Sequence, residues 1–122
     1  LEHHLMSVAE KIVVLGASDN PMRPSFAAAK LLYNKGFDIY PVSINLLSDK
    51  SMELSGMQAD TVTVFLHAAK QKKYYQYILS LHPKRIIFNP GTENPELEAL
   101  AKSQQIQIIK GCTIAMLVSG IW

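Results

Sequence analysis

Cysteine, long apolar runs and charge are all scarce in this sequence. Its 122 residues include one cysteine, Cys112, so an intrachain disulfide framework is excluded. The longest unbroken apolar run, 114–118, is far shorter than the roughly 20 residues of a membrane helix, and no secretory signal peptide is visible. We therefore expect a cytoplasmic protein that binds no membrane. Hydrophobic residues make up 48% and charged residues 18% of the chain, which is typical of a globular protein and excludes a disordered one.

The first residues indicate where the native domain begins, and the net charge indicates what kind of ligand it binds. Leu1-Glu2-His3-His4-Leu5 resembles an expression-tag remnant, so we expect one native domain over residues 6–122. Without Glu2, the formal net charge of +2 becomes +3. This mild, scattered basicity suits a small anionic ligand and argues against nucleic acid, which usually binds a basic stripe.

Segments typical of strands and helices alternate along the chain. The run Lys-Ile-Val-Val-Leu at 11–15 has the continuous apolar character of a buried parallel strand, and Gly16 ends it. We expect Ser25 to cap the first helix and Gly36 to follow that helix in a left-handed conformation. The further predicted strands are 38–42, 61–66, 84–88 and 106–109, and the predicted helices are 25–35, 70–81, one that begins at Asn94-Pro95-Glu96, and 113–118.

This alternation predicts the fold class. We expect an α/β protein, a single Rossmann-like doubly wound domain with a five-stranded parallel sheet. Residues 43–60 lack a clean period and predict a long loop with at most one helical turn. Ligands of such sheets bind beyond the carboxyl ends of the strands, where the strand order reverses. The turns that follow the first four strands are therefore the candidate sites.

The usual dinucleotide and catalytic motifs are missing. The fingerprint G-x-G-x-x-G is absent because Ala17 and Ser18 follow Gly16. Residues 40–45, the end of the second predicted strand and the positions after it, contain no acid to hold ribose hydroxyls, and Asp38 lies at the wrong end of that strand. An ordinary NAD site is therefore disfavoured. The spacing also reveals no metal site, P-loop or catalytic set of side chains.

The turn after the first strand favours an anion. Gly16 permits a tight turn, Ser18 and Asn20 offer short polar side chains, and Arg23 offers a permanent cation. The helix that begins near Ser25 adds free N–H groups and the positive end of its dipole, which together bind phosphate well. The alternative is a loop whose polar groups satisfy only one another.

The segment 13–25 carries the pattern G-x-S-x-N-P-x-R-x-S. It resembles the opening of the small CoA-binding proteins, which are single Rossmann domains similar to the CoA-binding domain of succinyl-CoA synthetase alpha subunits. Tyr40-Pro41-Val42, the loop 89–94 and Cys112 fall where that family has similar features. The resemblance extends from about residue 11 to residue 113. Ser43 and Ile44 depart from it, since many relatives have Asn and Pro there.

The resemblance implies binding of coenzyme A, or an acyl-CoA, through its nucleotide half. It implies that Gly16, Ser18 and Asn20 approach the phosphates. It also implies that Arg23 and Ser25 close the first turn and that Val42 and Ser43 lie beside the adenosine. The implied cofactor-binding residues are Gly16, Ala17, Ser18, Asn20, Arg23, Ser25, Val42, Ser43, Asn89, Gly91 and Thr92. The active-site histidine of the larger ligases belongs to a further domain that this chain does not contain, so their catalysis is not carried over.

Three hypotheses follow. The first, which we favour, is a non-catalytic CoA-binding module. The second is an enzyme that acts on acyl-CoA with Cys112 as nucleophile, although the sequence shows no base beside the thiol. The third is a CoA-binding subunit of a separate ligase, and a homodimer is a further option. The run of Lys70, Lys72 and Lys73 at a predicted helix start fits a solvated face, and contact with the CoA 3′-phosphate is the alternative.

Overall fold

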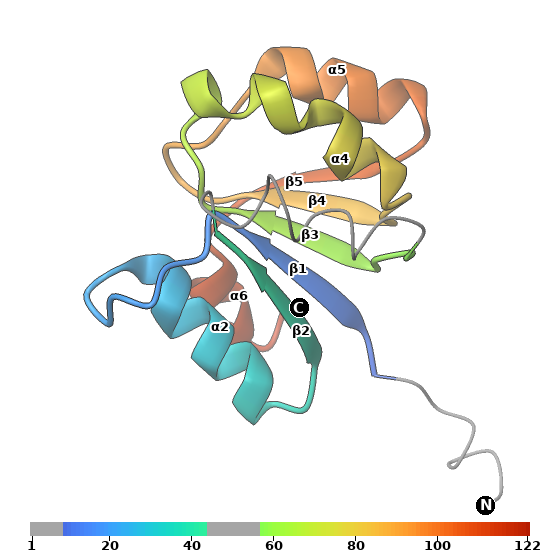
Figure 1. Cartoon of the computed structure of the whole chain (residues 1–122). Helices are drawn as coiled ribbons and strands as arrows, with labels where there is room; N and C mark the ends of the chain where they lie inside the picture. Colours follow the sequence, from blue (N-terminus) through green and yellow to red (C-terminus); the bar gives the residue numbers. More distant parts are fainter. Residues whose placement is uncertain (1–8, 44–56) are drawn as a thin grey trace, which may run out of the picture.

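Five parallel strands form one sheet in the computed structural model, which describes residues 9–43 and 57–122 (Figure 1). The expected tag remnant and most of the expected loop at 43–60 lie outside the described residues. The strands are β1 (Lys11–Leu15), β2 (Asp38–Val42), β3 (Thr61–Val64), β4 (Arg85–Phe88) and β5 (Gln107–Lys110).

The order of the strands across the sheet is β2-β1-β3-β4-β5. From β1 the chain first adds β2 on one side, and then adds β3, β4 and β5 on the other. The order therefore reverses between β1 and β3, and ligands of such sheets bind beyond the carboxyl ends of the strands at this point. The outer strands are β2, which contains Pro41, and β5.

The helices cover both faces of the sheet. Figure 1 shows α2 (Pro24–Asn34) and α6 (Thr113–Ser119) on one face and α4 (Tyr75–Ser80) and α5 (Pro95–Ser103) on the other. This arrangement confirms the predicted Rossmann-like doubly wound domain. Among the described residues, no helix is both long enough and apolar enough to cross a membrane.

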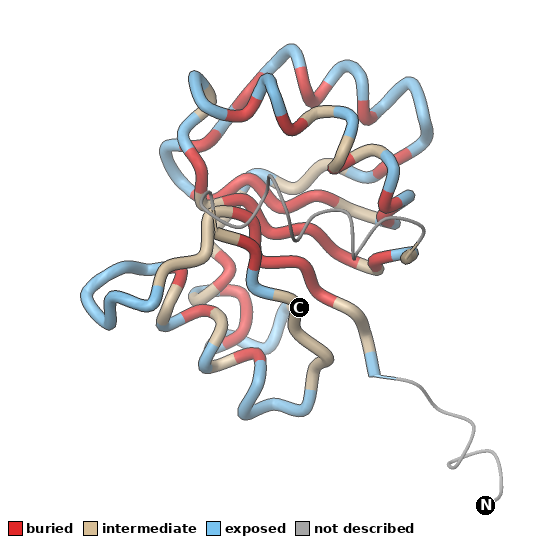
Figure 2. Tube along the Cα trace, viewed as in Figure 1, coloured by how far each residue is buried: buried red, intermediate tan, exposed pale blue. Residues whose placement is uncertain are grey.

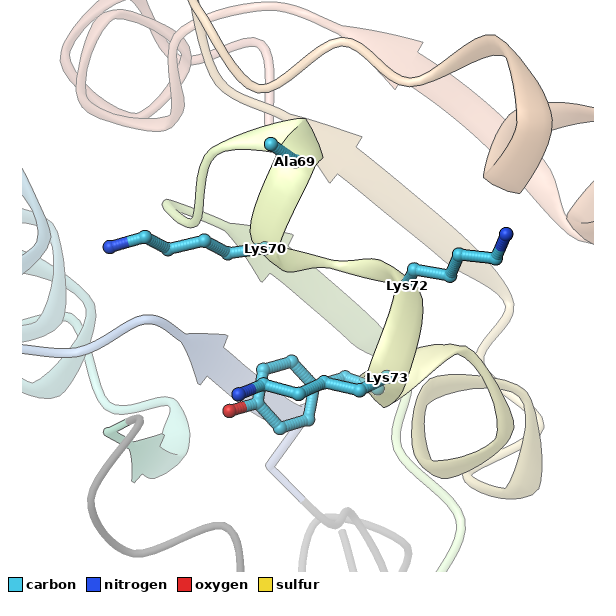
Figure 3. Close-up of a pocket in the computed structure, with 5 residues that line it drawn as sticks. Ala69, Lys70, Lys72 and Lys73 are labelled. Carbon is cyan, nitrogen blue, oxygen red and sulfur yellow. The ribbon is translucent and has the colours of Figure 1, made fainter.

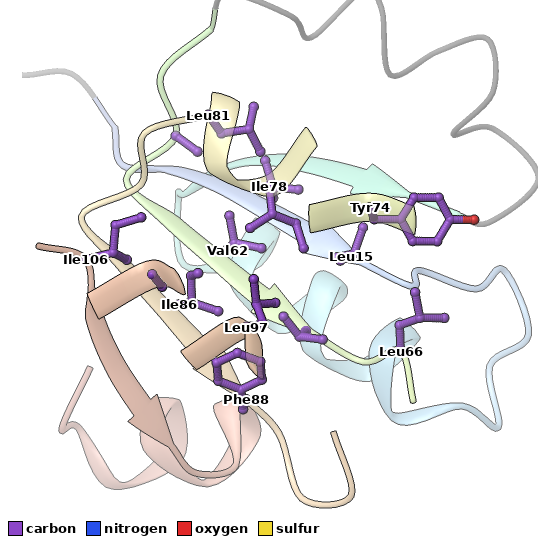
Figure 4. Close-up of a cluster of buried hydrophobic side chains, with 14 of the residues drawn as sticks. Leu15, Val62, Leu66, Tyr74, Ile78, Leu81, Ile86, Phe88, Leu97 and Ile106 are labelled. Carbon is purple, nitrogen blue, oxygen red and sulfur yellow. The ribbon is translucent and has the colours of Figure 1, made fainter. Parts of the chain in front are cut away.

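The side chains of β1 point alternately to the two faces of the sheet and pack into two apolar layers. Ile12 and Val14 pack with Leu32 of α2 and Leu117 of α6, whereas Val13 and Leu15 belong to the larger cluster beneath α4 and α5. Figure 4 shows that larger cluster, with Phe88 near Leu97 of α5 and with Ile78 of α4 nearer Val62 of β3. In Figure 2 the buried positions follow the strands and the inward faces of the helices. The sheet is thus covered on both sides, as continuous apolar strands require.

Two of the expected helix ends are confirmed. Gly36 follows α2 with φ of +94°, the left-handed conformation that glycine adopts without strain. Asn94 caps α5, because its Oδ1 accepts a hydrogen bond from the Leu97 N–H at 3.2 Å. Pro95 begins that helix, and Glu96 lies in its first turn near the positive end of the dipole.

The expected cap at Ser25 is wrong. Helix α2 begins one residue earlier, at Pro24, and Arg23 is its N-cap without a side-chain hydrogen bond to the helix. Proline suits the first helical position because its φ is already helical and it has no N–H to leave unpaired. Ser25 therefore lies inside the first turn and is 3% exposed.

The single helix expected over 70–81 is also wrong. The segment forms two 3₁₀ turns, η2 (Ala68–Lys70) and η3 (Lys72–Tyr74), and only then the short helix α4. Gln71 lies between the two turns and is fully buried. Its side chain hydrogen-bonds to the main chain of two loops, and these tertiary bonds compete with a continuous helix.

The core makes a direct stability prediction. Phe88 is fully buried, so Phe88→Ala should leave a cavity and lower the free energy of unfolding by about 3–5 kcal/mol. Leu100 on α5 is 40% exposed and serves as the control, and Leu100→Ala should cost about 0.5 kcal/mol. Urea denaturation measures both values. Similar losses in the two variants would contradict the assignment of Phe88 to the core.

Candidate functional site

The candidate site lies where the strand order reverses, at the carboxyl ends of β1 and β3. The chain leaves β1 at Leu15 and makes the turn 16–23 before α2 begins. The turn starts directly beside the end of β3, since the Phe65 N–H donates to the Leu15 carbonyl at 2.8 Å. The main candidate residues predicted from the sequence lie in this turn, and the fold brings the turn to the point where the strand order reverses.

At Gly16 the backbone of the first turn passes close to the backbone of the segment that follows β3. Its φ is +88°, and a Cβ atom at this position would lie 3.1 Å from the main-chain nitrogen of Leu66. The N–H groups of Gly16 and Ala17 both donate to the Val42 carbonyl, at 2.9 and 3.1 Å. Glycine is therefore favoured at this position both by its conformation and by the space available.

The turn after Gly16 is stabilised by its own short side chains. Ser18 Oγ accepts from the Asn20 N–H at 3.1 Å, and Asn20 Oδ1 accepts from the Met22 N–H at 3.0 Å. Both side chains act here as acceptors, which leaves the Ser18 hydroxyl hydrogen and the Asn20 Nδ2 group able to donate. The turn is thus ordered and still presents donors at its exposed surface.

The N-terminus of α2 adds further donors. In the part of the chain that the structure describes, the N–H groups of Ser18, Asp19 and Ser25 have no hydrogen-bond acceptor. No side chain caps this helix end, and the exposed Arg23 lies at its N-cap position. The positive end of the helix dipole, free N–H groups and a guanidinium group therefore occur together, a combination that binds anions.

The end of β2 forms the neighbouring wall. Val42 is 3% exposed, and its carbonyl holds the first turn, so its role in the described structure is to position the backbone. Ser43 is half-buried and follows directly. Contact of either residue with adenosine stays a prediction.

The loop between β4 and α5 holds the three remaining candidates. Asn89 is buried: its Nδ2 donates to Thr63 Oγ1 and to the Val64 carbonyl, both at 2.8 Å, and its Oδ1 accepts from the Thr113 N–H at 2.9 Å. Thr92 is buried as well and donates from Oγ1 to the Asn89 carbonyl at 2.8 Å. Gly91 lies at the exposed tip with φ of +89°. Asn89 and Thr92 therefore shape this loop, and their contact with a ligand stays a prediction.

Gln71 is a further buried amide, and the sequence alone did not predict it. Its Nε2 donates to the Leu66 carbonyl at 2.7 Å and to the Thr92 carbonyl at 2.8 Å, and its Oε1 accepts from Asn94 Nδ2 at 2.9 Å. Gln71 thereby joins the segment after β3 to the loop after β4. A glutamine within a polar run carries no sequence feature that distinguishes an inward side chain from a solvated one.

Tyr75 extends this network toward the surface. Its hydroxyl donates to Glu96 Oε1 at 3.0 Å and accepts from Asn94 Nδ2 at 2.9 Å. Burial raises the pKa of Tyr75, and the hydrogen bond to Glu96 acts in the same direction. The hydroxyl therefore remains protonated near neutral pH and continues to donate.

Cys112 precedes α6 and is a half-buried free thiol. Thr113, the first residue of that helix, is held by Asn89 and by a hydroxyl–hydroxyl hydrogen bond of 2.7 Å to Thr63. The neighbouring Lys110 forms an ion pair with Glu98, Nζ to Oε1 3.6 Å. Among the described residues, no three His, Cys, Asp or Glu side chains are grouped to hold a metal ion.

Comparison with known proteins assigns the family. Residues 10–118, nearly the whole chain, match the family described as the CoA binding domain. The chain belongs to this CoA-binding family. The resemblance inferred from the first turn is thereby confirmed.

Solved structures with this fold cover almost all of the chain. An uncharacterized protein with 33% identity gives a TM-score of 0.79 and is matched over 95% of this chain and 100% of its own. The protein cell-free ID.343 from Thermus thermophilus has 22% identity, a TM-score of 0.78, and coverage of 93% and 91%. A hypothetical protein from Pyrococcus horikoshii OT3 has 21% identity, a TM-score of 0.74, and coverage of 93% and 84%. The last two show the fold alone.

The close approach at Gly16 can be measured against a matched glycine. Gly36 also has a left-handed φ, but a Cβ there would meet no atom within 4 Å. We expect Gly36→Ala to cost about 1–2 kcal/mol, the strain of a left-handed alanine. Gly16→Ala should cost clearly more, because its Cβ also crowds the backbone at Leu66. Equal losses in urea denaturation would contradict the role assigned to this contact.

Proposed function

We propose that the protein binds coenzyme A, or an acyl-CoA, through its nucleotide and phosphates at the turn between β1 and α2. The observation that carries the proposal is the uncapped, exposed N-terminus of α2 at the reversal of strand order. In a chain of the CoA-binding family, this end of the helix is the natural place for the ligand's diphosphate.

The residues of the turn have distinct roles in this proposal. Gly16 brings the backbone of the turn close to the segment after β3, because no Cβ separates the two. The N–H groups of Ser18, Asp19 and Ser25 donate to phosphate oxygens, and the Asn20 amide adds a side-chain donor. Arg23 supplies a charge that suits phosphate geometry, since guanidinium binds two oxygens at once.

We propose further that the protein holds CoA without a chemical step. A nucleophilic Cys112 would need a base to accept the thiol proton. Lys110, the neighbouring basic residue in the sequence, is engaged by Glu98 in the described structure, which supports a binding role over catalysis. A docking partner such as a ligase chain is compatible with this role.

The first test concerns the choice between CoA and NAD. Val42 ends β2 and Ser43 follows it, where a dinucleotide site has an acid for the ribose hydroxyls, so CoA should be preferred. A ligand at one hundred times its dissociation constant stabilises the folded state by about 2.7 kcal/mol. In a thermal-shift series at equal concentrations, CoA should raise the melting temperature more than NAD. A larger shift with NAD would overturn the proposal.

The second test concerns Arg23. Loss of a charge-assisted hydrogen bond to phosphate costs about 1.5–3 kcal/mol, so Arg23→Ala should weaken CoA binding about tenfold to more than a hundredfold. Lys30 is an exposed cation further along α2, and Lys30→Ala is the control that should leave CoA affinity unchanged. Calorimetric titration measures both. Unchanged affinity in the Arg23 variant would place the phosphates elsewhere.

A further inference from the structure

A lysine-rich hollow of about 390 Å³ lies beside the candidate site (Figure 3). It follows β3 and is lined by Ala69, Lys70, Lys72, Lys73 and Tyr74. Figure 3 shows the side chains of Lys70 and Lys73 extending to the same side, whereas that of Lys72 extends the opposite way. Two ammonium groups thus gather on one side of the 3₁₀ turns, and no carboxylate is among the lining residues.

These lysines are presented by a fixed part of the backbone. Gln71, between Lys70 and Lys72, is fully buried and makes its three side-chain hydrogen bonds at 2.7 to 2.9 Å. The turn that carries the cations is therefore bound to the loops after β3 and β4. A solvated lysine face does not need a buried side chain such as Gln71 to hold its backbone. A binding surface with an ordered backbone loses less conformational entropy when the ligand binds.

Tyr74 orders one of the two side chains further. The ring is mostly buried in the core beneath α4, and the Nζ atom of Lys73 lies 5.4 Å from the ring centroid. At this distance the ammonium group is attracted to the face of the ring. Lys73 is thereby held at the hollow while its charge remains available to an anion.

The hollow and the turn before α2 follow neighbouring strands, β3 and β1, at the same edge of the sheet. The first turn touches the segment after β3, because a Cβ on Gly16 would lie 3.1 Å from the Leu66 nitrogen. That segment continues from Leu66 directly into η2, which ends at Lys70. Two cationic groups, Arg23 with the α2 N-terminus and Lys70 with Lys73, therefore stand on the two sides of the reversal in strand order.

Coenzyme A carries two separate anionic groups on one nucleotide: the diphosphate and a phosphomonoester at the ribose 3′ position. We propose that Lys70 and Lys73 bind the 3′-phosphomonoester, while the turn before α2 binds the diphosphate. This inference rests on the proposed function and adds to it a basis for selecting CoA over nucleotides that lack the third phosphate. Lysine suits a phosphomonoester because its compact, mobile ammonium group acts as a point charge on clustered oxygens.

The test compares CoA with 3′-dephospho-CoA by calorimetric titration of the full chain. The unmodified protein should bind CoA at least about tenfold more tightly, as expected when a charge-assisted contact is lost. Lys70→Ala and Lys73→Ala should each weaken CoA binding and leave the affinity for dephospho-CoA unchanged. The retained binding of dephospho-CoA also shows that each variant is folded. Lys72→Ala removes the same charge from the same turn and should change neither affinity.

Three outcomes would overturn the inference. Equal affinity of the unmodified protein for both compounds would refute the 3′-phosphate site and leave the proposed function intact. An equal effect of Lys72→Ala on CoA would show that only the general positive field matters. An equal loss of both compounds in the Lys70 and Lys73 variants would place these lysines on another part of the ligand. If neither compound binds the unmodified protein, the proposed function itself fails.

Discussion

The crossing of the chain over the ends of three strands governs the rest of the site. The chain leaves β1 at Gly16, hydrogen-bonds to the end of β2 through the Val42 carbonyl, and passes against the backbone at Leu66 after β3. A Cβ atom on residue 16 would lie 3.1 Å from the Leu66 nitrogen, so a side chain would crowd this crossing. The crossing sets the direction in which the chain leaves the sheet toward Pro24, where α2 begins, and with it the place of Arg23. The turn at Gly16 therefore decides that the N-terminus of α2 and the guanidinium group of Arg23 lie at this edge of the sheet.

Two buried carboxamides complete the opposite wall. Asn89 joins β3 to the start of α6, and Gln71 joins the segment after β3 to the loop before α5. An amide side chain can both donate and accept, so each one links loops whose own backbone groups would otherwise be buried without partners. The loops at this edge of the sheet are thus bound to each other as well as to the strands.

Much of the fold could be predicted from sequence because its determinants are local. Apolar runs such as 11–15 identify strands, and Asn94 followed by Pro95 identifies a helix start. The tight turn at Gly16 was also predictable, since the glycine and the polar residues after it form a specific pattern, and the role of that turn in binding stays a prediction. The role of Gln71 was not, because its partners lie in other loops and become neighbours only in the folded chain. The cap at Ser25 was misplaced because proline at the preceding position decides where α2 begins.

Pro41 gives the sheet an asymmetry between its two edges. It lies in β2, an outer strand, opposite Val14 of β1. A strand that added to this edge would find no N–H at Pro41 and would lose one hydrogen bond in the middle of its ladder. Pro41 therefore discourages the addition of a further strand at β2, and with it the open-ended association of chains along that edge. The strand that protects this edge is the same one that ends at the candidate nucleotide site.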